Sequence, residues 1–315
     1  MQAIGIDLGG TNIKAALIDQ EDGILKKVAI PTEADQGKDH VFDRIKLAID
    51  RIMEGRSEKP IGVGMGSPGV VSLDRTTVSK PPNLAGWEVV RVSEEVYQRT
   101  GYSCIVENDA NLAALGSSRF GVGRAFDSMI MITLGTGVGG GIILHRNLFR
   151  GATGSAAELG HVIIDYHGPL SNSNTRGGIE AYLGQRFLSR YAADLIRQQP
   201  DNPLFKAFHD RFDELEPVDL YHAAESGNEL AAEILQKSGE KLGYAIVNYI
   251  HILDIRKIII SGGVAKAGHW IIDPAKKTAL SYLMPPFRTD FEILFEPLGN
   301  DAALFGASSL AMENL

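Results

Sequence analysis

The sequence predicts an α/β protein, and two features of the chain carry this prediction. Near the N-terminus, short β-branched runs at 2–8 and 13–19 flank a glycine pair, which is the pattern of a β-hairpin. Farther along, strand-like runs alternate with segments of helical spacing, as 256–264 and 269–283 do. Strands and helices mixed in this way are typical of the α/β class.

The first half of the chain holds the hairpin and then alternating elements. Helices are expected where apolar residues recur every three or four positions, and strands where apolar runs end in glycine or proline turns. The expected strands are 2–8, 13–19, 28–32, 61–66 and 103–107, and the expected helices are 39–54, 88–99 and 108–120.

In the second half, residues 128–145 form two apolar runs around a glycine cluster and resemble the opening of the chain. Aligning 4–18 with 130–144 superposes the two glycine turns. The likeness indicates either one strand–turn–strand unit used in two related lobes, or only the similarity of any two such turns. The later expected elements are helices at 179–198, 229–253, 269–283 and 300–313, strands at 256–264 and 291–297, and a polar surface segment at 199–217.

The composition is that of a globular protein without a nucleic-acid or membrane partner. Of 315 residues, 44% are hydrophobic and 22% are charged, and 31 Lys and Arg against 39 Asp and Glu give a net charge of −8. An acidic chain without a basic cluster is poorly suited to bind phosphate backbones or anionic lipid. The single cysteine, Cys104, excludes an internal disulfide and is expected in the core. With no signal-peptide pattern and no membrane-length apolar run, a cytoplasmic location is expected.

Four glycine-centred turns follow apolar strands, and together they predict a cradle for nucleotide phosphates. Glycine lets backbone N–H groups approach an anion closely, and threonine hydroxyls in two of the turns add donors. The P-loop and dinucleotide-binding patterns do not fit any of them. The turns are Asp7-Leu8-Gly9-Gly10-Thr11, Gly66-Ser67-Pro68-Gly69, Leu134-Gly135-Thr136-Gly137 and Ser261-Gly262-Gly263.

Asp7 ends an otherwise apolar strand, where a carboxylate needs hydrogen-bond donors or a cation. One interpretation is that it faces Mg²⁺ or a water at the phosphate turn. The alternative is a turn-capping aspartate bonded to the amides of Gly10 or Thr11. The phosphate-type turn that follows at once favours the first interpretation.

Polar residues also gather where the strand at 103–107 becomes the helix at 108–120. Asn108 or Asp109 could simply cap the helix. A cap explains one polar residue, however, and not the whole cluster of Glu107, Asn108, Asp109 and Asn111. An aspartate at the end of a strand can accept the proton of a substrate hydroxyl, so Asp109 is a candidate general base.

A third group of polar residues lies in 157–184, where Glu158 and His161 precede a Ser/Asn/Gly-rich stretch and Glu180 follows it. From the residue types alone, this group could be a metal site, an acid/base device, or a set of hydrogen-bonding groups for a ligand rich in hydroxyls. Asn83, in a loop after two prolines, is by itself only a turn residue.

Taken together, these motifs resemble the ROK family (repressors, open reading frames and sugar kinases) of the actin/hexokinase/Hsp70-like ATPase superfamily. The resemblance runs nearly from end to end and is most specific from Leu134 to His161, with Gly151 correctly spaced between them. The motifs that carry it are Asp7–Thr11, Asn83-Leu84, Gly86-Trp87, Glu107–Asn111, Leu134–Gly141, Glu158–His161, Ile260–Val264 and Asp301–Leu304.

The resemblance implies an ATP-dependent kinase that phosphorylates the 6-hydroxyl of glucose or a closely related sugar, with Mg²⁺ as cofactor. It implies Asp109 as the general base. The implied fold is a pair of ribonuclease H-like, actin-like ATPase lobes around a central cleft, with 1–115 plus 298–315 as the small domain and 116–297 as the large one. A homodimer is usual among relatives. The implied sugar-binding residues are Asn83, Asn108, Asp109, Glu158, His161 and Glu180, and the implied nucleotide and Mg²⁺ residues are Asp7, Gly9, Gly10, Thr11, Thr136, Gly137, Gly262 and Gly263.

The chain departs from the family pattern at one place. Most relatives carry three cysteines after the Gly-His pair, and these cysteines bind a structural zinc together with a histidine. Here their positions hold Ser171, Ser173 and Gly178, which cannot replace thiolates. We therefore expect no structural zinc and interpret Glu158, His161 and Glu180 as a sugar-binding set. The departure leaves open how His161 is oriented and how the loop at 166–178 is stabilised.

Alternative functions remain at this point. The sugar could be fructose, mannose, allose or an N-acetylhexosamine, because these differ from glucose by one hydroxyl or an acetamido group. A sugar-sensing regulator without catalysis, of the kind the family also contains, would be expected to carry a DNA-binding region before the first strand, whereas the Asp7 motif begins almost at residue 1. The retained Asp109 argues against a binding protein that has lost catalysis, and a polyphosphate-using kinase would need a basic track.

Overall fold

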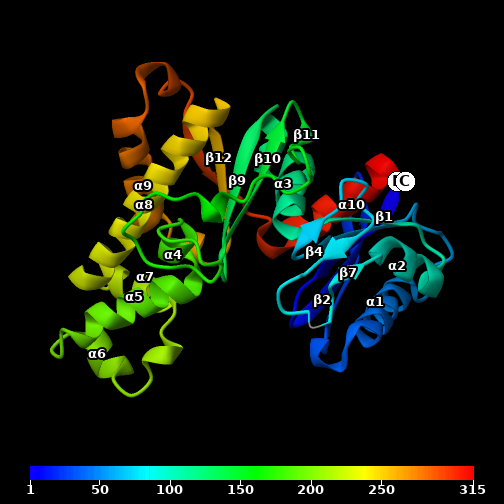
Figure 1. The fold of residues 1–315 in the computed structure, drawn as a ribbon, viewed down its shortest axis with the longest axis horizontal. Helices are drawn as coiled ribbons and strands as arrows, with labels where there is room; N and C mark the ends of the chain where they lie inside the picture. Colours follow the sequence, from blue (N-terminus) through cyan, green and yellow to red (C-terminus); the bar gives the residue numbers. More distant parts are fainter. Residues whose placement is uncertain (85) are drawn as a thin grey trace. The chain divides into compact units, whose positions relative to one another are not determined.

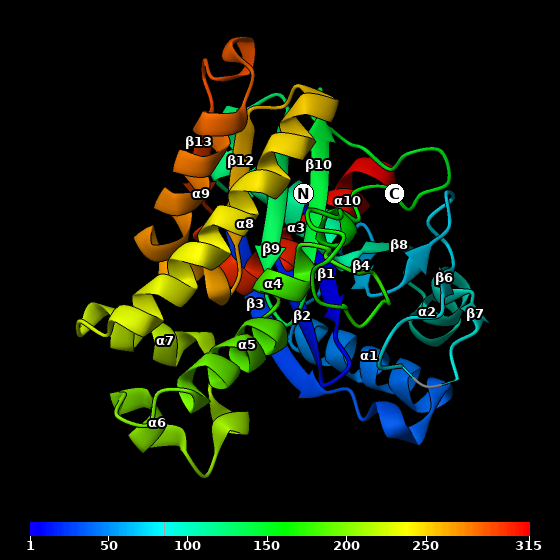
Figure 2. The same ribbon diagram turned by 60° about the vertical axis from the view of Figure 1, so that its left-hand side comes forward.

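The computed structural model describes residues 1–84 and 86–315 and divides into two compact units. We call Met1–Ser128, Gly141–Ala157 and Pro297–Leu315 unit 1, and Met129–Gly140 and Glu158–Glu296 unit 2. Figures 1 and 2 show the chain coloured from the N-terminus in blue to the C-terminus in red. Each unit combines strands with helices, so the predicted α/β class is confirmed.

Unit 1 contains a five-stranded mixed sheet of order β3-β2-β1-β4-β8. The first three strands form an antiparallel meander, and the last two run parallel to β1. The parallel arrangement brings the carboxyl ends of β1, β4 and β8 to the same edge of the sheet. The strands are β1 (Gln2–Leu8), β2 (Asn12–Asp19), β3 (Gly23–Pro31), β4 (Val63–Ser67) and β8 (Cys104–Asn108).

Helices cover both faces of this sheet. Side chains alternate along a strand, so Ile4 and Ile6 of β1 pack into one core with α1 (Lys38–Met53) and α2 (Val92–Thr100). The opposite face lies against α10 (Ala302–Asn314), which packs on α3 (Asp109–Phe120) (Figure 1). Gly5 permits this approach, because a Cβ there would overlap the carbonyl oxygen of Leu304. A small sheet contains β5 (Val70–Val71), β6 (Val78–Ser79) and β7 (Val89–Val90).

A second five-stranded sheet has the order β11-β10-β9-β12-β13, in which β9, β12 and β13 run parallel. Position by position, this order repeats that of the first sheet. The repetition favours a structural unit used twice over a chance likeness of two glycine turns. The strands are β9 (Met129–Leu134), β10 (Val138–Leu144), β11 (Asn147–Leu148), β12 (Lys257–Ser261) and β13 (Glu292–Phe295).

Most helices of unit 2 contact α8 (Glu229–Leu253), the 25-residue helix drawn in yellow in Figure 2. Glycines on α8 let α9 (His269–Tyr282) approach closely, because a Cβ at Gly239 would overlap Ile271. The other α-helices of this unit are α4 (Glu180–Leu183), α5 (Gln185–Arg197), α6 (Pro203–Phe208) and α7 (Pro217–Glu225).

Several predicted boundaries are wrong. The helix expected at 88–99 begins only at Val92, because the two preceding valines form β7. The helix expected at 179–198 breaks at Gly184, where the backbone is extended and the Gln185 amide bonds the Gly135 carbonyl instead (2.9 Å). The polar segment at 199–217 contains α6, which Asn202 caps. No helix in the described part of the chain is long and apolar enough to cross a membrane.

Candidate active site

The carboxyl edge of the unit 1 sheet gathers the polar residues of its strands. Asp7 pairs in register with Gly66 of the neighbouring strand, and Gly66 pairs with Glu107 of the next. Neighbouring strands lie about 4.8 Å apart. The first glycine turn and the polar turn that begins at Glu107 therefore occupy one edge of one sheet.

Asn108 caps α3 (Asp109–Phe120), and Asp109 is its first residue. The sequence alone did not show which of the two is the cap. Oδ1 of Asn108 accepts hydrogen bonds from the amides of Ala110 (3.0 Å) and Asn111 (3.2 Å), so Asn108 is the helix cap. Asp109 is the first residue of α3, and its Oδ1 accepts a bond from the Ala110 amide (2.9 Å). The first turn of a helix, where the helix dipole is positive, is a common position for a carboxylate.

Asp7 takes part in an ion pair across the first hairpin. Its Oδ2 lies 3.0 Å from Nζ of Lys14, its register partner on β2, and both side chains are partly exposed. This lysine was not expected from the sequence, although opposite charges facing each other across strands are a recurrent stabilising pair. The pair places a cation beside the carboxylate that follows the apolar part of β1.

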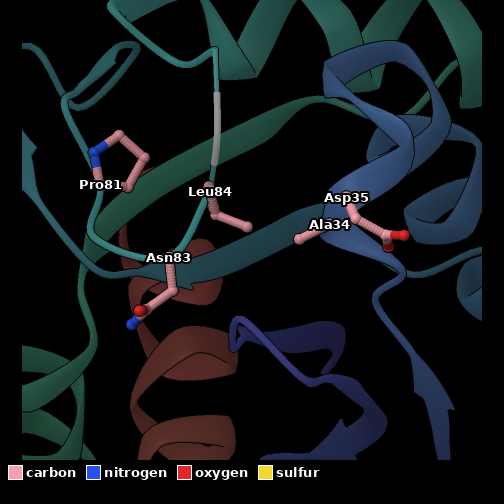
Figure 3. Close-up of a pocket in the computed structure, with 5 residues that line it drawn as sticks. All are labelled: Ala34, Asp35, Pro81, Asn83 and Leu84. Atoms are coloured by element: carbon pink, nitrogen blue, oxygen red, sulfur yellow. The ribbon is translucent and has the colours of Figure 1, made fainter.

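The turn after β1 lies against the loop that carries Asn83. A Cβ on Gly10 would come within 2.8 Å of the Asn83 Cβ, so glycine is needed for this approach. Asn83 itself has a left-handed backbone (φ 67°). It lines a pocket of about 490 Å³ in unit 1, within the size range of small-molecule sites (Figure 3). Ala34, Asp35, Pro81 and Leu84 line the same pocket.

Trp87 supports the other end of that loop. Its side chain is buried, and its ring stacks on Phe42 of α1 with centroids 5.2 Å apart. Trp87 is therefore a core side chain of unit 1. Between Asn83 and Trp87, Ala85 of the motif lies outside the described residues.

Glu107 is the member of the polar cluster whose role the sequence did not indicate. Its side chain is fully buried between two arginines: Arg75 Nε donates to Oε2 at 3.1 Å, and Arg150 Nε lies 2.7 Å from the same oxygen. Asn111 donates a further hydrogen bond (3.2 Å). Arg150 also donates to the carbonyls of Ser72 (2.9 Å) and Leu73 (2.8 Å). The cluster ties the end of β8 to two loops of unit 1.

In unit 2, two of the predicted phosphate turns follow neighbouring parallel strands. Thr133 of β9 pairs with Ser261 of β12, so the turns that begin at Gly135 and Gly262 leave the same edge of the sheet. Gly262 has φ 103°, and a Cβ there would overlap the Leu134 carbonyl. Thr136, at the tip of its turn, is exposed. The edge presents backbone and hydroxyl groups, as a phosphate site requires.

Glu158, His161 and Glu180 come together around the start of β10. Glu180 Oε2 accepts a hydrogen bond from the Val138 amide (3.2 Å) and sits where a Cβ on Gly137 would be. His161 ends a short 3₁₀ helix, Leu159–His161, which the buried Tyr249 hydroxyl anchors by bonding the Leu159 carbonyl (2.7 Å). Nε2 of His161 lies 3.7 Å from Glu158 Oε2.

The residues at the former cysteine positions do not fit a structural zinc. Ser171 and Ser173 hydrogen-bond each other through their hydroxyls (2.8 Å), and Ser173 also contacts Nδ1 of His161 (3.1 Å). Neutral hydroxyls are not the thiolate ligands of such a site. Among the described residues, no group of three or more His, Cys, Asp or Glu side chains could hold a metal ion.

The predicted site residues divide between the two units. Unit 1 carries Asp7, Gly9, Gly10, Thr11, Asn83, Asn108 and Asp109, and unit 2 carries Thr136, Gly137, Glu158, His161, Glu180, Gly262 and Gly263.

Comparison with known proteins gives consistent matches along the whole chain. The model of the ROK family matches residues 3–314. The glucokinase of Thermotoga maritima is 35% identical and is aligned over 100% of this chain and 98% of its own length. The crystal structure of a ROK family glucokinase from Streptomyces griseus, in complex with glucose and AMPPNP, has a TM-score of 0.85 at 34% identity, over 100% of both chains. The xylose repressor of Bacillus subtilis is 24% identical over 99% of this chain and 77% of the repressor.

Proposed function

The chain belongs to the ROK family and has the actin-like ATPase fold, and from this we propose that it is an ATP-dependent kinase acting on the 6-hydroxyl of glucose or a close relative of glucose. The observation that carries the proposal is the placement of Asp109, which begins a helix at the edge of the sheet that also holds the Asp7 turn. Identity of 35% to a glucokinase over the full chain supports the substrate class.

In the proposed reaction, Asp109 orients the sugar and takes its proton. The sugar O6 forms a bond to the γ-phosphorus of ATP while the bond from that phosphorus to the oxygen of ADP breaks, and the O6 proton passes to the Asp109 carboxylate. Because phosphoryl transfer has a loose transition state, the proton leaves late and an ordinary carboxylate suffices as base.

The groups that bind the sugar are, in this proposal, carboxylates, amides and one imidazole, supplied by Asn83, Asn108, Glu158, His161 and Glu180. Such groups pair with adjacent hydroxyls, and a sugar with the wrong hydroxyl pattern leaves one of them without a partner. Two hydrogen bonds support this role. The Val138 amide on β10 holds the Glu180 carboxylate, and the Tyr249 hydroxyl on α8 holds the segment that carries His161.

The glycine turns of unit 2 are the sites at which this proposal places the phosphates of ATP. The Gly135 amide bonds the Gly137 carbonyl (3.0 Å), which closes this turn and leaves the exposed Thr136 at its tip as the group for a phosphate oxygen. Gly262 has φ 103°, a backbone that favours glycine and lets the chain approach an anion closely. Asp7 is the carboxylate that would face Mg²⁺. Mg²⁺ held there would neutralise negative charge on the phosphate groups. A single carboxylate is compatible with Mg²⁺, which takes most of its other ligands from phosphates and water.

The sugar specificity is tested by ADP release, measured with a coupled assay across a panel of sugars. We expect glucose to give the highest kcat/KM among glucose, mannose, fructose, allose and N-acetylglucosamine. A higher kcat/KM for another member would reassign the substrate within the same reaction. No ADP release with any of them would contradict the kinase proposal. The homodimer expected from relatives is tested by light scattering during size-exclusion chromatography.

A second candidate function is favoured by one observation, the match to a xylose repressor. A sugar-sensing regulator without catalysis would bind a sugar in calorimetry but release no ADP. The sugar panel separates the two functions, because turnover is expected only of the kinase.

A further inference from the structure

The loop 166–178 carries a chain of hydroxyl groups that ends on the imidazole of His161. Ser171 Oγ contacts Ser173 Oγ at 2.8 Å, Ser173 Oγ donates to Thr175 Oγ1 at 3.2 Å, and Ser173 Oγ lies 3.1 Å from His161 Nδ1. Ser171 is buried, with 5% of its surface exposed, so this end of the chain is enclosed in the unit.

The backbone of the loop holds these hydroxyls in place without a metal. Two isolated β-bridges, Ile163 with Gly178 and Leu170 with Arg176, close it, and the Ser171 amide bonds the Thr175 carbonyl (3.0 Å). Gly177 has φ 66°, and a Cβ there would overlap the Asp165 carbonyl, so this position of the loop requires glycine. The position of Ser173 is therefore set by the fold of the loop.

The hydrogen-bonding capacity of Ser173 indicates which nitrogen of His161 carries a hydrogen. A serine hydroxyl has one proton and can accept two hydrogen bonds. We assign this proton to Thr175, because of the three contacts only this one has a geometry that fixes its direction. In that assignment Ser173 accepts hydrogen bonds from both Ser171 and His161. Nδ1 of the neutral imidazole is then the N–H donor, and Nε2 carries the lone pair.

We infer that Ser173 is a positioning residue, which holds the proton of neutral His161 on Nδ1 and so keeps Nε2 as a hydrogen-bond acceptor. This inference rests on the proposed role of His161 in sugar binding. Nε2 lies 3.7 Å from Glu158 Oε2, which is beyond hydrogen-bond distance. In this tautomer both atoms are hydrogen-bond acceptors, and they lie side by side. Two acceptors side by side match two hydroxyl groups on adjacent sugar carbons, each of which donates one proton. The opposite tautomer would place an N–H donor there and bind Glu158 instead.

The direct test is the tautomer of His161, read from long-range ¹H–¹⁵N correlation spectra at mildly alkaline pH. Comparison with His161→Gln assigns the signals among the eight histidines. We expect protonated Nδ1 and unprotonated Nε2 in the wild type, and a mixture of tautomers in Ser173→Ala. Ser173→Thr, which keeps a hydroxyl, should restore the single tautomer, and Asn172→Ala, an exposed neighbour in the same loop, should not change it. Protonated Nε2 in the wild type, or an unchanged tautomer in Ser173→Ala, would overturn the inference.

Kinetics provide a second readout. Loss of one hydrogen bond that orients a ligand group should raise KM for the sugar about 3- to 10-fold in Ser173→Ala, with kcat within about twofold of the wild type and KM for ATP unchanged. A fall in kcat with unchanged sugar KM would contradict the positioning role. If the wild type phosphorylates no sugar, the proposed function fails, and the tautomer spectra alone then decide the role of Ser173.

Discussion

The carboxylate of Glu107 and the guanidinium of Arg150 form an ion pair in the interior of unit 1, with Nε 2.7 Å from Oε2. Glu107 is fully buried, and 10% of the Arg150 side chain is exposed. Burial lowers the pKa of Arg150, and the charge of Glu107 opposes that shift. Glu107 directly precedes Asn108 and Asp109 in the chain, so we expect loss of this buried pair to disturb the proposed catalytic turn.

Glu107→Gln should destabilise the protein strongly. The amide keeps the shape of the side chain but leaves Arg75 and Arg150 without a buried anion, and loss of one partner of a buried pair costs about 3–5 kcal/mol. Urea unfolding measures the change. Asp50→Asn is the matched control, because Asp50 pairs with Lys46 on the exposed surface of α1, where such a pair contributes about 0.5 kcal/mol or less. Equal losses in the two variants would show that the buried cluster is not important for stability.

Gly137→Ala should weaken sugar binding and leave the fold intact. The new Cβ would overlap Glu180 Oε2, which is the end of a flexible side chain and can move away from the Val138 amide. We expect sugar KM to rise about 10-fold or more, with little change in Tm. Gly135→Ala, two residues earlier, meets open space and should leave sugar KM unchanged. If Gly137→Ala raises the KM for ATP and leaves the KM for the sugar normal, Glu180 does not bind the sugar.

The stability of the protein should decline above pH 9 partly through Cys104. Burial raises the pKa of this thiol from its ordinary 9.0 to about 12. Between these values the unfolded chain releases the proton and the folded protein retains it. The contribution of Cys104 to the free energy of unfolding is therefore fully present below pH 9, and it falls by about 1.4 kcal/mol per pH unit as the pH rises towards 12. Urea unfolding at pH 8 and pH 10 should show a smaller decline in Cys104→Ala than in the wild type. Identical declines would mean that the thiol ionises in the folded state.

The purified protein should contain no stoichiometric zinc. The hydroxyls of Ser171 and Ser173 already bond each other and His161, and they lack the charge that zinc ligands need. Elemental analysis by mass spectrometry measures the metal content, and EDTA should leave Tm unchanged. One zinc atom per chain, lost together with stability on chelation, would overturn this account of the loop.

Local patterns allowed most of the fold to be predicted. The Asn108 cap, the glycine turns and the long amphipathic helix at 229–253 depend on residues near one another in sequence, and the structure places them as expected. The break at Gly184 could not be predicted, because it depends on a bond from the next amide to Gly135 on a distant turn. Tertiary hydrogen bonds of this kind override helical periodicity.

The buried cluster around Glu107 shows the same limit within the site. Its arginines lie 32 residues before it and 43 residues after it (107 − 75 and 150 − 107), and no periodic pattern connects positions so far apart. One signal was available. A charged residue that continues the apolar run Cys104-Ile105-Val106 needs a buried partner, although the sequence does not say which. The contact between Ser173 and His161 could not be predicted from the sequence either, because it forms only when the loop is folded.

The central claim is that Asp109 is the general base, and its amide variant tests this most directly. Asp109→Asn keeps the side-chain oxygen that accepts the Ala110 amide bond, so the start of α3 should stay intact. ADP release with glucose should fall by about 10²–10⁴-fold, while the glucose Kd measured by calorimetry stays within a few-fold of the wild type. Turnover near the wild-type rate in this variant would contradict the account.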